Sequence, residues 1–282
     1  MTTFVEPTTV DEACRLLADD AISPKLVSGG TALVLMMRQG LIAPTSLVSL
    51  GAVPGLSSIV EDDGGIVIGA RSTLTQVAND ELVRREAPAL AEACRLVGNV
   101  RVRNVATIGG NIAEADYASD PPSVLIAMNA TCSIQGVSTQ RSATVQDLIT
   151  GFYTNSLEPD EVITAVTVPK TRPASRSCYL KYVSRSSEDR PCVGVAVVAD
   201  FENAAVRQLS VVVGAVADIP QRRDEIAGLA VGRSLEPALI EEIAGSYAEA
   251  IDPMDDARGS AWYRRRMIRV FVRRALERVA TT

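Results

Sequence analysis

The chain has 282 residues, of which 47% are hydrophobic and 22% charged, a composition typical of a globular protein with one large or two ordinary domains. Its formal net charge of −6 argues against nucleic acid as the main partner. No apolar run has the length of a membrane span and the N-terminus shows no signal-peptide pattern, so we expect a cytoplasmic protein.

Two features of the composition exclude classes of chemistry. The chain contains no histidine, so it can form neither a Ser-His-Asp triad nor a His-ligated metal site. Its five cysteines are widely spaced and none forms a C-x-x-C pair, which argues against an iron–sulfur or zinc site on this chain.

The first part of the chain predicts helices and strands in alternation. Thr9 and Glu12 form a capping-box pattern in front of a helix, and Asp62-Asp63-Gly64-Gly65 is a hairpin signal between two apolar runs. Further elements are expected at 25–27 and 46–50 (strands), from 32 to near Gly40 (helix), after Thr73 (helix) and at 88–97 (helix).

The middle of the chain continues this pattern up to a polar break. Asp120-Pro121-Pro122 is typical of a helix start, with Asp120 as N-cap and proline in the first turn. Strands are expected at 131–135 and 162–168, with a short helix at 144–149 between them. The polar stretch 169–177 is a candidate linker. We therefore divide the chain into a domain at 1–172 and a second domain at 173–282.

Beyond this break the pattern changes to consecutive strands. Short turns separate the expected strands at 179–183, 193–201 and 206–213, and such meanders are usually antiparallel. Helices are expected at 237–250 and 260–280. The last one is rich in arginine, which in an acidic protein predicts a solvated or subunit-facing surface.

Two glycine pairs are the main candidates for a ligand site. Ser28-Gly29-Gly30-Thr31 stands directly before an apolar helix, and Thr107-Ile108-Gly109-Gly110-Asn111 repeats the pattern. Adjacent glycines can adopt φ > 0 and present successive N–H groups to an anion. Together they predict a diphosphate held between two loops. Each pair alone is also compatible with a tight structural turn.

The residues around these pairs carry a family resemblance. The runs V-S-G-G-T-A-L and V-R-N-V-A-T-I-G-G-N-I-A-E-A-D-Y-A-S-D, with L-E-P-D-E and D-D-A-R-G-S-A-W-Y-R-R further on, resemble the FAD-binding medium subunit of molybdenum hydroxylases. That family includes the carbon monoxide dehydrogenase flavoprotein and the flavin domain of xanthine dehydrogenase. The resemblance implies an α+β fold. Its first part would be an FAD-binding domain of the vanillyl-alcohol-oxidase type, with two α/β subdomains at about 1–55 and 56–172, followed by a C-terminal domain of antiparallel sheet and helices.

The resemblance also implies a set of cofactor contacts. By position, it assigns FAD binding to Ser28, Gly29, Gly30, Thr31, Ala32, Leu33, Thr107, Ile108, Gly109, Gly110, Asn111, Asp120, Ile163 and Lys181.

Three of these assignments have a structural alternative. Asp120 would bind the FAD hydroxyls or cap the helix that starts at Pro121. Ile163 would pack on the flavin ring or be an ordinary core residue. Lys181 would lie near the ring or be an exposed strand lysine.

The function implied by the resemblance is electron transfer within a complex. Electrons from a large molybdenum-cofactor subunit would pass through the [2Fe–2S] clusters of a small subunit to FAD on this chain and then to an outside acceptor. Two alternatives stay open: a self-contained FAD-dependent oxidase or dehydrogenase, and a non-enzymatic module that binds phosphate or a nucleotide. We predict a non-covalent FAD, because histidine, the usual covalent anchor, is absent.

Overall fold

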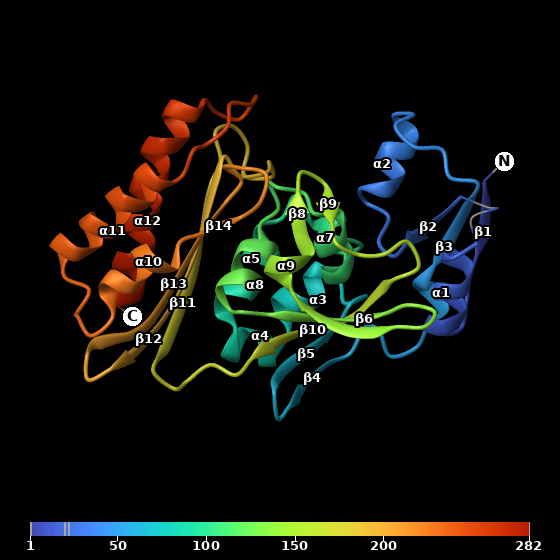
Figure 1. Ribbon diagram of the computed structural model, residues 1–282, viewed down its shortest axis with the longest axis horizontal. Coiled ribbons are helices and arrows are strands. Elements are labelled where there is room, and N and C mark those ends of the chain that lie inside the picture. The colour runs from blue at the N-terminus through green and yellow to red at the C-terminus, as the bar shows by residue number, and fades with distance from the viewer. Residues whose placement is uncertain (1, 20, 22, 282) are drawn as a thin grey trace.

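The computed structural model describes residues 2–19, 21 and 23–281. Within them, three larger sheets follow one another along the chain, and β8 and β9 form a small two-stranded sheet (Figure 1). The first sheet is parallel, with strand order β1-β3-β2. Its part of the chain contains β1 (Thr3–Val5), α1 (Val10–Leu17), β2 (Pro24–Val27), α2 (Leu33–Arg38) and β3 (Ser46–Ser49). Thr9 caps α1, as predicted, and α1 buries Ala13, Cys14 and Leu17 against Val48 and Leu50.

The second sheet is antiparallel and has the order β4-β5-β10-β6-β7. Its strands are β4 (Ile59–Asp62), β5 (Gly65–Gly69), β6 (Thr131–Gln135), β7 (Gln140–Thr144) and β10 (Val162–Pro169). The predicted hairpin is confirmed, because β4 and β5 are joined by Asp63 and Gly64 alone.

Helices and one small hairpin complete this second part. They are the 3-10 turn η2 (Leu50–Ala52), α3 (Leu74–Asn79), α4 (Glu81–Glu86), α5 (Pro88–Leu96), α6 (Val100–Arg103), α7 (Ile108–Glu114), α8 (Pro121–Ala127), α9 (Val145–Leu148), β8 (Ile149–Gly151) and β9 (Thr154–Asn155). Thr73 caps α3 with a full capping box, and Thr144 caps α9. The helices and the sheet share the largest hydrophobic core of the molecule.

The third sheet is the predicted antiparallel meander, in the order β11-β12-β13-β14. Its part of the chain comprises β11 (Ser175–Tyr182), β12 (Val193–Glu202), β13 (Ala205–Gly214), β14 (Gln221–Arg222), α10 (Asp224–Ala227), the 3-10 turn η3 (Gly228–Ala230), α11 (Pro237–Ala250) and α12 (Ala261–Thr281). Because β11 starts four residues earlier than predicted, the linker shortens to 170–174. The predicted division at residues 172 and 173 falls in this connection and stays a prediction.

Both faces of the third sheet are buried, by different neighbours. Helices α11 and α12 cover one face, where Val195 and Val197 join their core (Figure 1). Ala196, between them, points the other way and packs with the core around α5 and α8. The alternation along a strand thus fixes the sheet between two layers of helices.

The arginines of α12 do not form one exposed basic surface. The prediction is wrong for Arg264, which is fully buried and donates to the carbonyl oxygens of Cys192 (3.1 Å) and Met254 (2.7 Å) and to Asp256 (2.7 Å). Carboxylate partners also hold several arginines nearer the surface, namely Arg265, Arg269, Arg273 and Arg278. Within 2–19, 21 and 23–281, no helix combines the length and apolarity that crossing a bilayer requires.

Candidate functional site

The first glycine pair lies in the turn between β2 and α2. Gly30 has φ = +69°, a left-handed conformation that glycine adopts without a steric penalty. The first hydrogen bond at the start of α2 is donated by the Val34 N–H to the Gly30 carbonyl oxygen (2.9 Å). The five preceding N–H groups, from Gly29 to Leu33, donate to no atom in the described part of the chain. The turn therefore offers a row of free donors.

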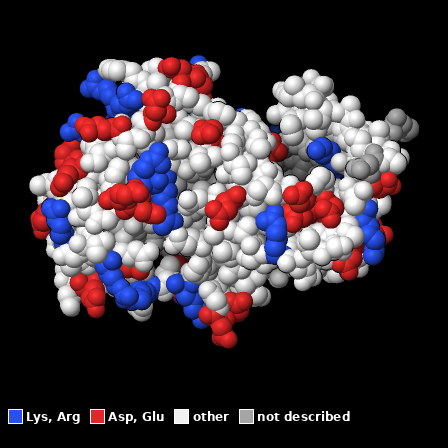
Figure 2. Space-filling view, viewed as in Figure 1, with Lys and Arg blue, Asp and Glu red and all other residues white. Residues whose placement is uncertain are grey.

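A buried side chain at the same turn also lacks a partner. The Ser28 hydroxyl oxygen is shielded from solvent and forms no hydrogen bond with any described residue. A buried polar atom without a partner is unfavourable by about 1–3 kcal/mol. Together with the free N–H groups it indicates a ligand that accepts hydrogen bonds. In Figure 2 the surface is hollowed between the part that carries α2 and the centre of the molecule.

The two glycine pairs lie next to each other, as predicted. A Cβ atom at Gly29 would stand 2.0 Å from the carbonyl oxygen of Val105 and 3.0 Å from Cα of Ala106, just before the second pair. Only glycine fits at that distance. The first turn therefore rests on the backbone that leads into α7.

The second pair is not a loop, which corrects the sequence-based expectation. Thr107 is the N-cap of α7, and Gly109 and Gly110 belong to the helix's first turn without positive φ. The N–H groups of Ile108, Gly109 and Gly110 donate to Ser72 O (3.0 Å), Ala70 O (2.9 Å) and Thr107 Oγ1 (3.2 Å). These donors are already used, so the predicted anion-binding nest at the second pair is wrong.

The second pair instead lets α7 approach the second sheet closely. A Cβ at Gly109 would lie 2.6 Å from Cβ of Ala70, at the end of β5. Gly110 is exposed, and the Asn111 amide exchanges hydrogen bonds with the Ser119 hydroxyl (2.8 and 3.0 Å). Contacts of these residues with FAD stay predictions.

Asp120 and Lys181 form a buried ion pair. The Lys181 ammonium donates to Asp120 Oδ2 (3.0 Å) and to the Leu96 carbonyl oxygen (2.7 Å), and the Tyr179 hydroxyl donates to Asp120 Oδ1 (2.7 Å). The exposed fractions of the Lys181 and Asp120 side chains are 4% and 3%. The exposed-lysine alternative is therefore wrong. The pair joins α8 to β11 across the seam between the second and third sheets.

Asp120 does not cap α8, and the environment explains its actual role. Its backbone is helical and its side chain makes no capping hydrogen bond, because both carboxylate oxygens face β11. Burial raises the pKa of the Asp120 carboxyl to about 6, although Lys181 and the Tyr179 hydrogen bond act in the opposite direction. Its binding to FAD hydroxyls stays a prediction.

Ile163 lies in β10 beside a register shift between Ile163 and Ala165. It is 5% exposed and belongs to the same core as Ile134, its partner across the sheet. Ile163 is therefore a core residue, as the structural alternative stated, and its contact with the flavin ring stays a prediction.

Two residues of the Asp120 site were not predicted. Tyr179 holds the carboxylate, and Gly194 on β12 leaves room for the tyrosine, since a Cβ there would lie 2.3 Å from its hydroxyl oxygen. Strand alternation places Tyr179 and Lys181 on one face, two residues apart. The spacing of two residues from Lys181 could have identified Tyr179 as part of the site. No local sequence pattern identifies Gly194.

The comparison with protein families covers almost the whole chain. The family described as the FAD binding domain in molybdopterin dehydrogenase matches residues 1–171, and the CO dehydrogenase flavoprotein C-terminal domain matches residues 178–279. The glyceraldehyde dehydrogenase medium chain of Sulfolobus acidocaldarius is 30% identical over 278 residues, which are 98% of each chain. The carbon monoxide dehydrogenase medium chain of Hydrogenophaga pseudoflava is 30% identical over 270 residues, 96% of this chain and 94% of that one.

Solved structures give the same result. Carbon monoxide dehydrogenase from Hydrogenophaga pseudoflava, in a form that lacks the Mo-pyranopterin moiety of the molybdenum cofactor, contains a chain with a TM-score of 0.94 and 29% identity. The alignment covers 98% of this chain and 96% of that chain. The resemblance seen in the sequence is confirmed: the protein belongs to the family of FAD-binding medium subunits of molybdenum hydroxylase-type dehydrogenases and is an oxidoreductase subunit.

Proposed function

We propose that the turn from Ser28 to Leu33 holds the diphosphate of a non-covalently bound FAD. The observation that carries this proposal is the row of free N–H groups from Gly29 to Leu33 beside the unpartnered, buried Ser28 hydroxyl. A diphosphate is a chain of hydrogen-bond acceptors and matches such a row. Gly29 adds no side chain between the turn and Val105, so the donors stay aligned.

The second pair supports this site from below. Thr107 and Gly109 fix the start of α7 against β5, and Val105 then forms the floor on which Gly29 rests. The exposed Gly110 leaves the surface of α7 open toward a ligand. We place Thr107 to Asn111 beside the cofactor. The buried residues Thr107, Ile108 and Gly109 are supports, and the exposed Gly110 and the half-buried Asn111 are the contacts.

The surrounding architecture follows the same proposal. We infer the vanillyl-alcohol-oxidase type of arrangement, in which the first and second sheets are the two subdomains and FAD lies between them and the C-terminal domain. What supports it is the adjacency of the two glycine pairs, one from each part, and the ion pair of Asp120 and Lys181 at the seam with the third sheet.

The role of the chain is to carry electrons inside a complex. When bound, FAD supplies a redox centre that takes up and releases electrons. This chain's residues bind and orient it, and they exclude water at the buried seam. We propose a small [2Fe–2S] subunit as electron donor and a large molybdenum-cofactor subunit as the site of substrate oxidation.

The cysteines of the chain support placing the clusters on a partner. All five are buried, and they are divided among three separate hydrophobic cores. A [2Fe–2S] cluster takes four cysteine thiolates at one point. Burial also raises the pKa of the Cys132 thiol to about 12, which keeps it protonated. The names of the relatives, medium chains of dehydrogenases, agree with a multi-subunit assembly.

Coexpression with the genes encoded next to this chain tests the proposal. We expect a stable complex that contains FAD, [2Fe–2S] clusters and a molybdenum cofactor, and acid precipitation should release its flavin into the supernatant. The chain expressed alone should bind FAD without oxidising a substrate. Flavin that stays with the precipitate would contradict non-covalent binding. A free-standing chain that oxidises a substrate at full rate would contradict the complex.

A further inference from the structure

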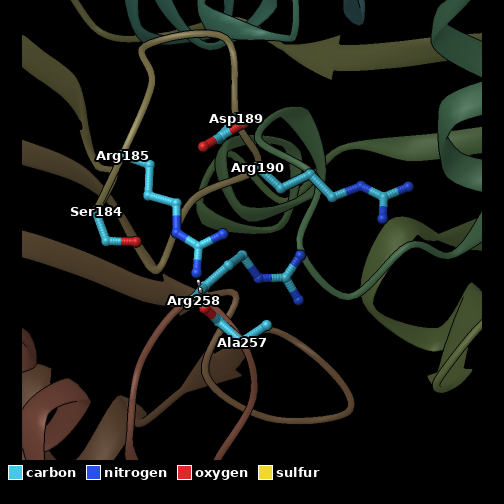
Figure 3. A pocket seen from close by; sticks show the side chains of 6 residues that line it. All are labelled: Ser184, Arg185, Asp189, Arg190, Ala257 and Arg258. Carbon is cyan, nitrogen blue, oxygen red and sulfur yellow. Dashed lines mark hydrogen bonds between the residues drawn. The ribbon is translucent and has the colours of Figure 1, made fainter.

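A cavity of about 240 Å³ lies away from the glycine pairs, between the β11–β12 connection and the segment before α12 (Figure 3). Three arginines dominate its lining. The lining residues are Ser184, Arg185, Asp189, Arg190, Ala257 and Arg258. Nothing in the proposed FAD site uses these side chains.

The loop that forms one wall is held by its own hydrogen bonds. The Ser186 N–H donates to the Asp189 carboxylate (3.1 Å), and the Asp189 N–H donates back to the Ser186 carbonyl oxygen (3.0 Å). The Glu188 N–H donates to the Ser186 hydroxyl (3.3 Å). Arg185 therefore projects from a turn of fixed shape.

The side chains of Arg185 and Arg258 both extend into the cavity, whereas Arg190 extends away from them (Figure 3). Arg258 uses Nε and Nη2 to bind Asp256 (3.1 and 2.6 Å), and Nη2 also contacts the Tyr117 hydroxyl. Arg185 has one long bond, from Nη2 to the Ala257 carbonyl oxygen (3.4 Å). A guanidinium has five N–H donors. Arg258 Nη1 and Arg185 Nε and Nη1 find no acceptor among the described residues.

Positive charge exceeds negative charge around these two groups. Asp256 is shared by Arg258 and Arg264, and the carboxylate of Asp189 is turned to the backbone of its own loop. Asp116, which also acts on Arg258, is paired with Arg190 (2.8 Å). Burial opposes ionisation of Asp256, but hydrogen bonds from Arg264 and Arg258 outweigh it and hold the pKa of this carboxyl below its usual range. Asp256 is thus a fixed single charge facing two arginines. Arg185 has no carboxylate partner in the described part of the chain.

We propose that this cavity binds the oxyanion head group of a small molecule, a phosphoryl or carboxylate group, between the guanidiniums of Arg185 and Arg258. Planar guanidinium groups match such anions in geometry and charge. The cavity is smaller than the roughly 300–1,000 Å³ of pockets for complete drug-sized ligands, so it takes one head group while the rest of the molecule stays outside.

Binding there would add a link between the β11–β12 connection and the part of the chain around α12, which already meet where Arg264 donates to the Cys192 carbonyl oxygen (3.1 Å). Arg185 belongs to the β11–β12 connection, and Arg258 belongs to the segment before α12 and touches Tyr117, next to α7. The long bond from Arg185 to Ala257 is the weak point of this contact. An anion bridging the two guanidiniums would replace it with charge-assisted hydrogen bonds and hold the connection in place.

Isothermal titration of the flavin-loaded full chain with sodium phosphate, sodium acetate and sodium chloride, at constant ionic strength, tests this proposal. We expect one saturable site for phosphate or acetate and none for chloride. Tighter phosphate binding assigns a phosphoryl ligand, and tighter acetate binding assigns a carboxylate. The titration is repeated after flavin removal. A saturable site in the flavin-loaded chain is separate from the FAD site, because bound FAD occupies the donors of that site. Binding seen only after flavin removal belongs to the turn from Ser28 to Leu33 and overturns the proposal.

Arg185→Gln is the decisive variant, because Arg185 is exposed and its loss leaves no carboxylate unpaired. It should weaken anion binding by about tenfold or more, as expected for a charge-assisted hydrogen bond. Arg233→Gln removes another surface arginine of the third-sheet part, 3.9 Å from Glu242, and should leave binding unchanged. The absence of a saturable site for both oxyanions, or equal affinity in Arg185→Gln, overturns the proposal.

Discussion

Around Gly29 and Gly30 the chain turns before a helix begins, whereas Gly109 and Gly110 are themselves the first turn of a helix. The first turn leaves five successive N–H groups without an acceptor among the described residues. The second pair donates its N–H groups to the end of β5 and to its own cap. Two stretches of nearly the same composition thus differ in what they leave free for a ligand.

This difference shows that a glycine pair marks a close approach without saying what approaches. At Gly29 the absent side chain makes room for the Val105 carbonyl, and the N–H groups point elsewhere. At Gly109 it makes room for Ala70, which takes the helix start into the core. We infer that the first pair binds the ligand and that the second pair supports the binding turn. The following predictions test that division.

Gly29→Ala should have the largest effect on FAD binding. The added Cβ would stand 2.0 Å from a backbone oxygen, so the turn must move away from Val105 and its donors lose their alignment. FAD affinity should fall by about tenfold or more, which corresponds to about 1.4 kcal/mol. Flavin titration followed by fluorescence measures this.

Gly245→Ala on α11 is the matched control, because a Cβ there meets nothing within 4 Å. It should bind FAD as tightly as the wild-type chain. Unchanged affinity in Gly29→Ala would remove the first turn from the site.

Gly109→Ala should mainly reduce stability. A Cβ would lie 2.6 Å from Cβ of Ala70, and overpacking of this kind lowers the free energy of unfolding by about 1–3 kcal/mol. Urea unfolding of the flavin-free chain gives this value. The FAD affinity of the folded chain should change less than in Gly29→Ala, since no free donor is disturbed. If Gly109→Ala lowered FAD affinity more than Gly29→Ala, the second pair would be the one that binds FAD and the first pair would be the support.

Asp120 follows the second pair in the sequence. For this residue, too, the question is whether it contacts a ligand or supports the fold. Its folded-state pKa of about 6 lies above the usual 3.8, so the folded chain holds the proton more tightly than the unfolded chain. The stability contributed by this group is present at low pH and is lost as the pH rises from about 4 to about 6. Asp120→Asn should remove that decline from the free energy of unfolding measured by urea across this range.

Asp147→Asn serves as the control, because Asp147 is exposed beside its cap, Thr144. Its free energy of unfolding should decline with rising pH as that of the wild-type chain does. If Asp120→Asn shows the same pH profile as the wild-type chain, the buried carboxylate does not act through its protonation.

The sequence predicted most of the elements because their patterns are local. The capping residues Thr9, Thr73 and Thr144 lie where the helices begin, and α11 has the predicted bounds. The meander was predictable because alternating apolar residues are separated by short turns. The adjacency of the two glycine pairs was predicted because two such turns can hold one diphosphate between them, and the family resemblance implied the same arrangement.

What the sequence did not predict depends on long-range contacts. Whether Asp120 caps α8 or faces β11 is decided by Tyr179 and Lys181, about sixty residues away. The burial of Arg264 depends on carbonyl groups of Cys192 and Met254, which no helical period reveals. The helix at α7 escaped prediction because two glycines weaken helix propensity, and only packing against Ala70 compensates for it.

The smallest expected effect comes from a comparison of two serines whose hydroxyl groups are buried. Ser28, at the first pair, and Ser72, whose carbonyl accepts the Ile108 N–H at the second pair, each carry a buried hydroxyl oxygen without a partner. In the flavin-free chain neither hydroxyl has a hydrogen-bond partner among the described residues, so Ser28→Ala and Ser72→Ala should raise the free energy of unfolding, by up to about 1–3 kcal/mol, rather than lower it. With FAD they should differ. Ser28→Ala should lower FAD affinity by about 0.5–1.5 kcal/mol, the usual net value of one hydrogen bond. Ser72→Ala should not change FAD affinity. Flavin titration of both variants decides the matter: equal affinities would mean that the Ser28 hydroxyl faces no ligand, and a loss confined to Ser72→Ala would place the diphosphate at the second pair.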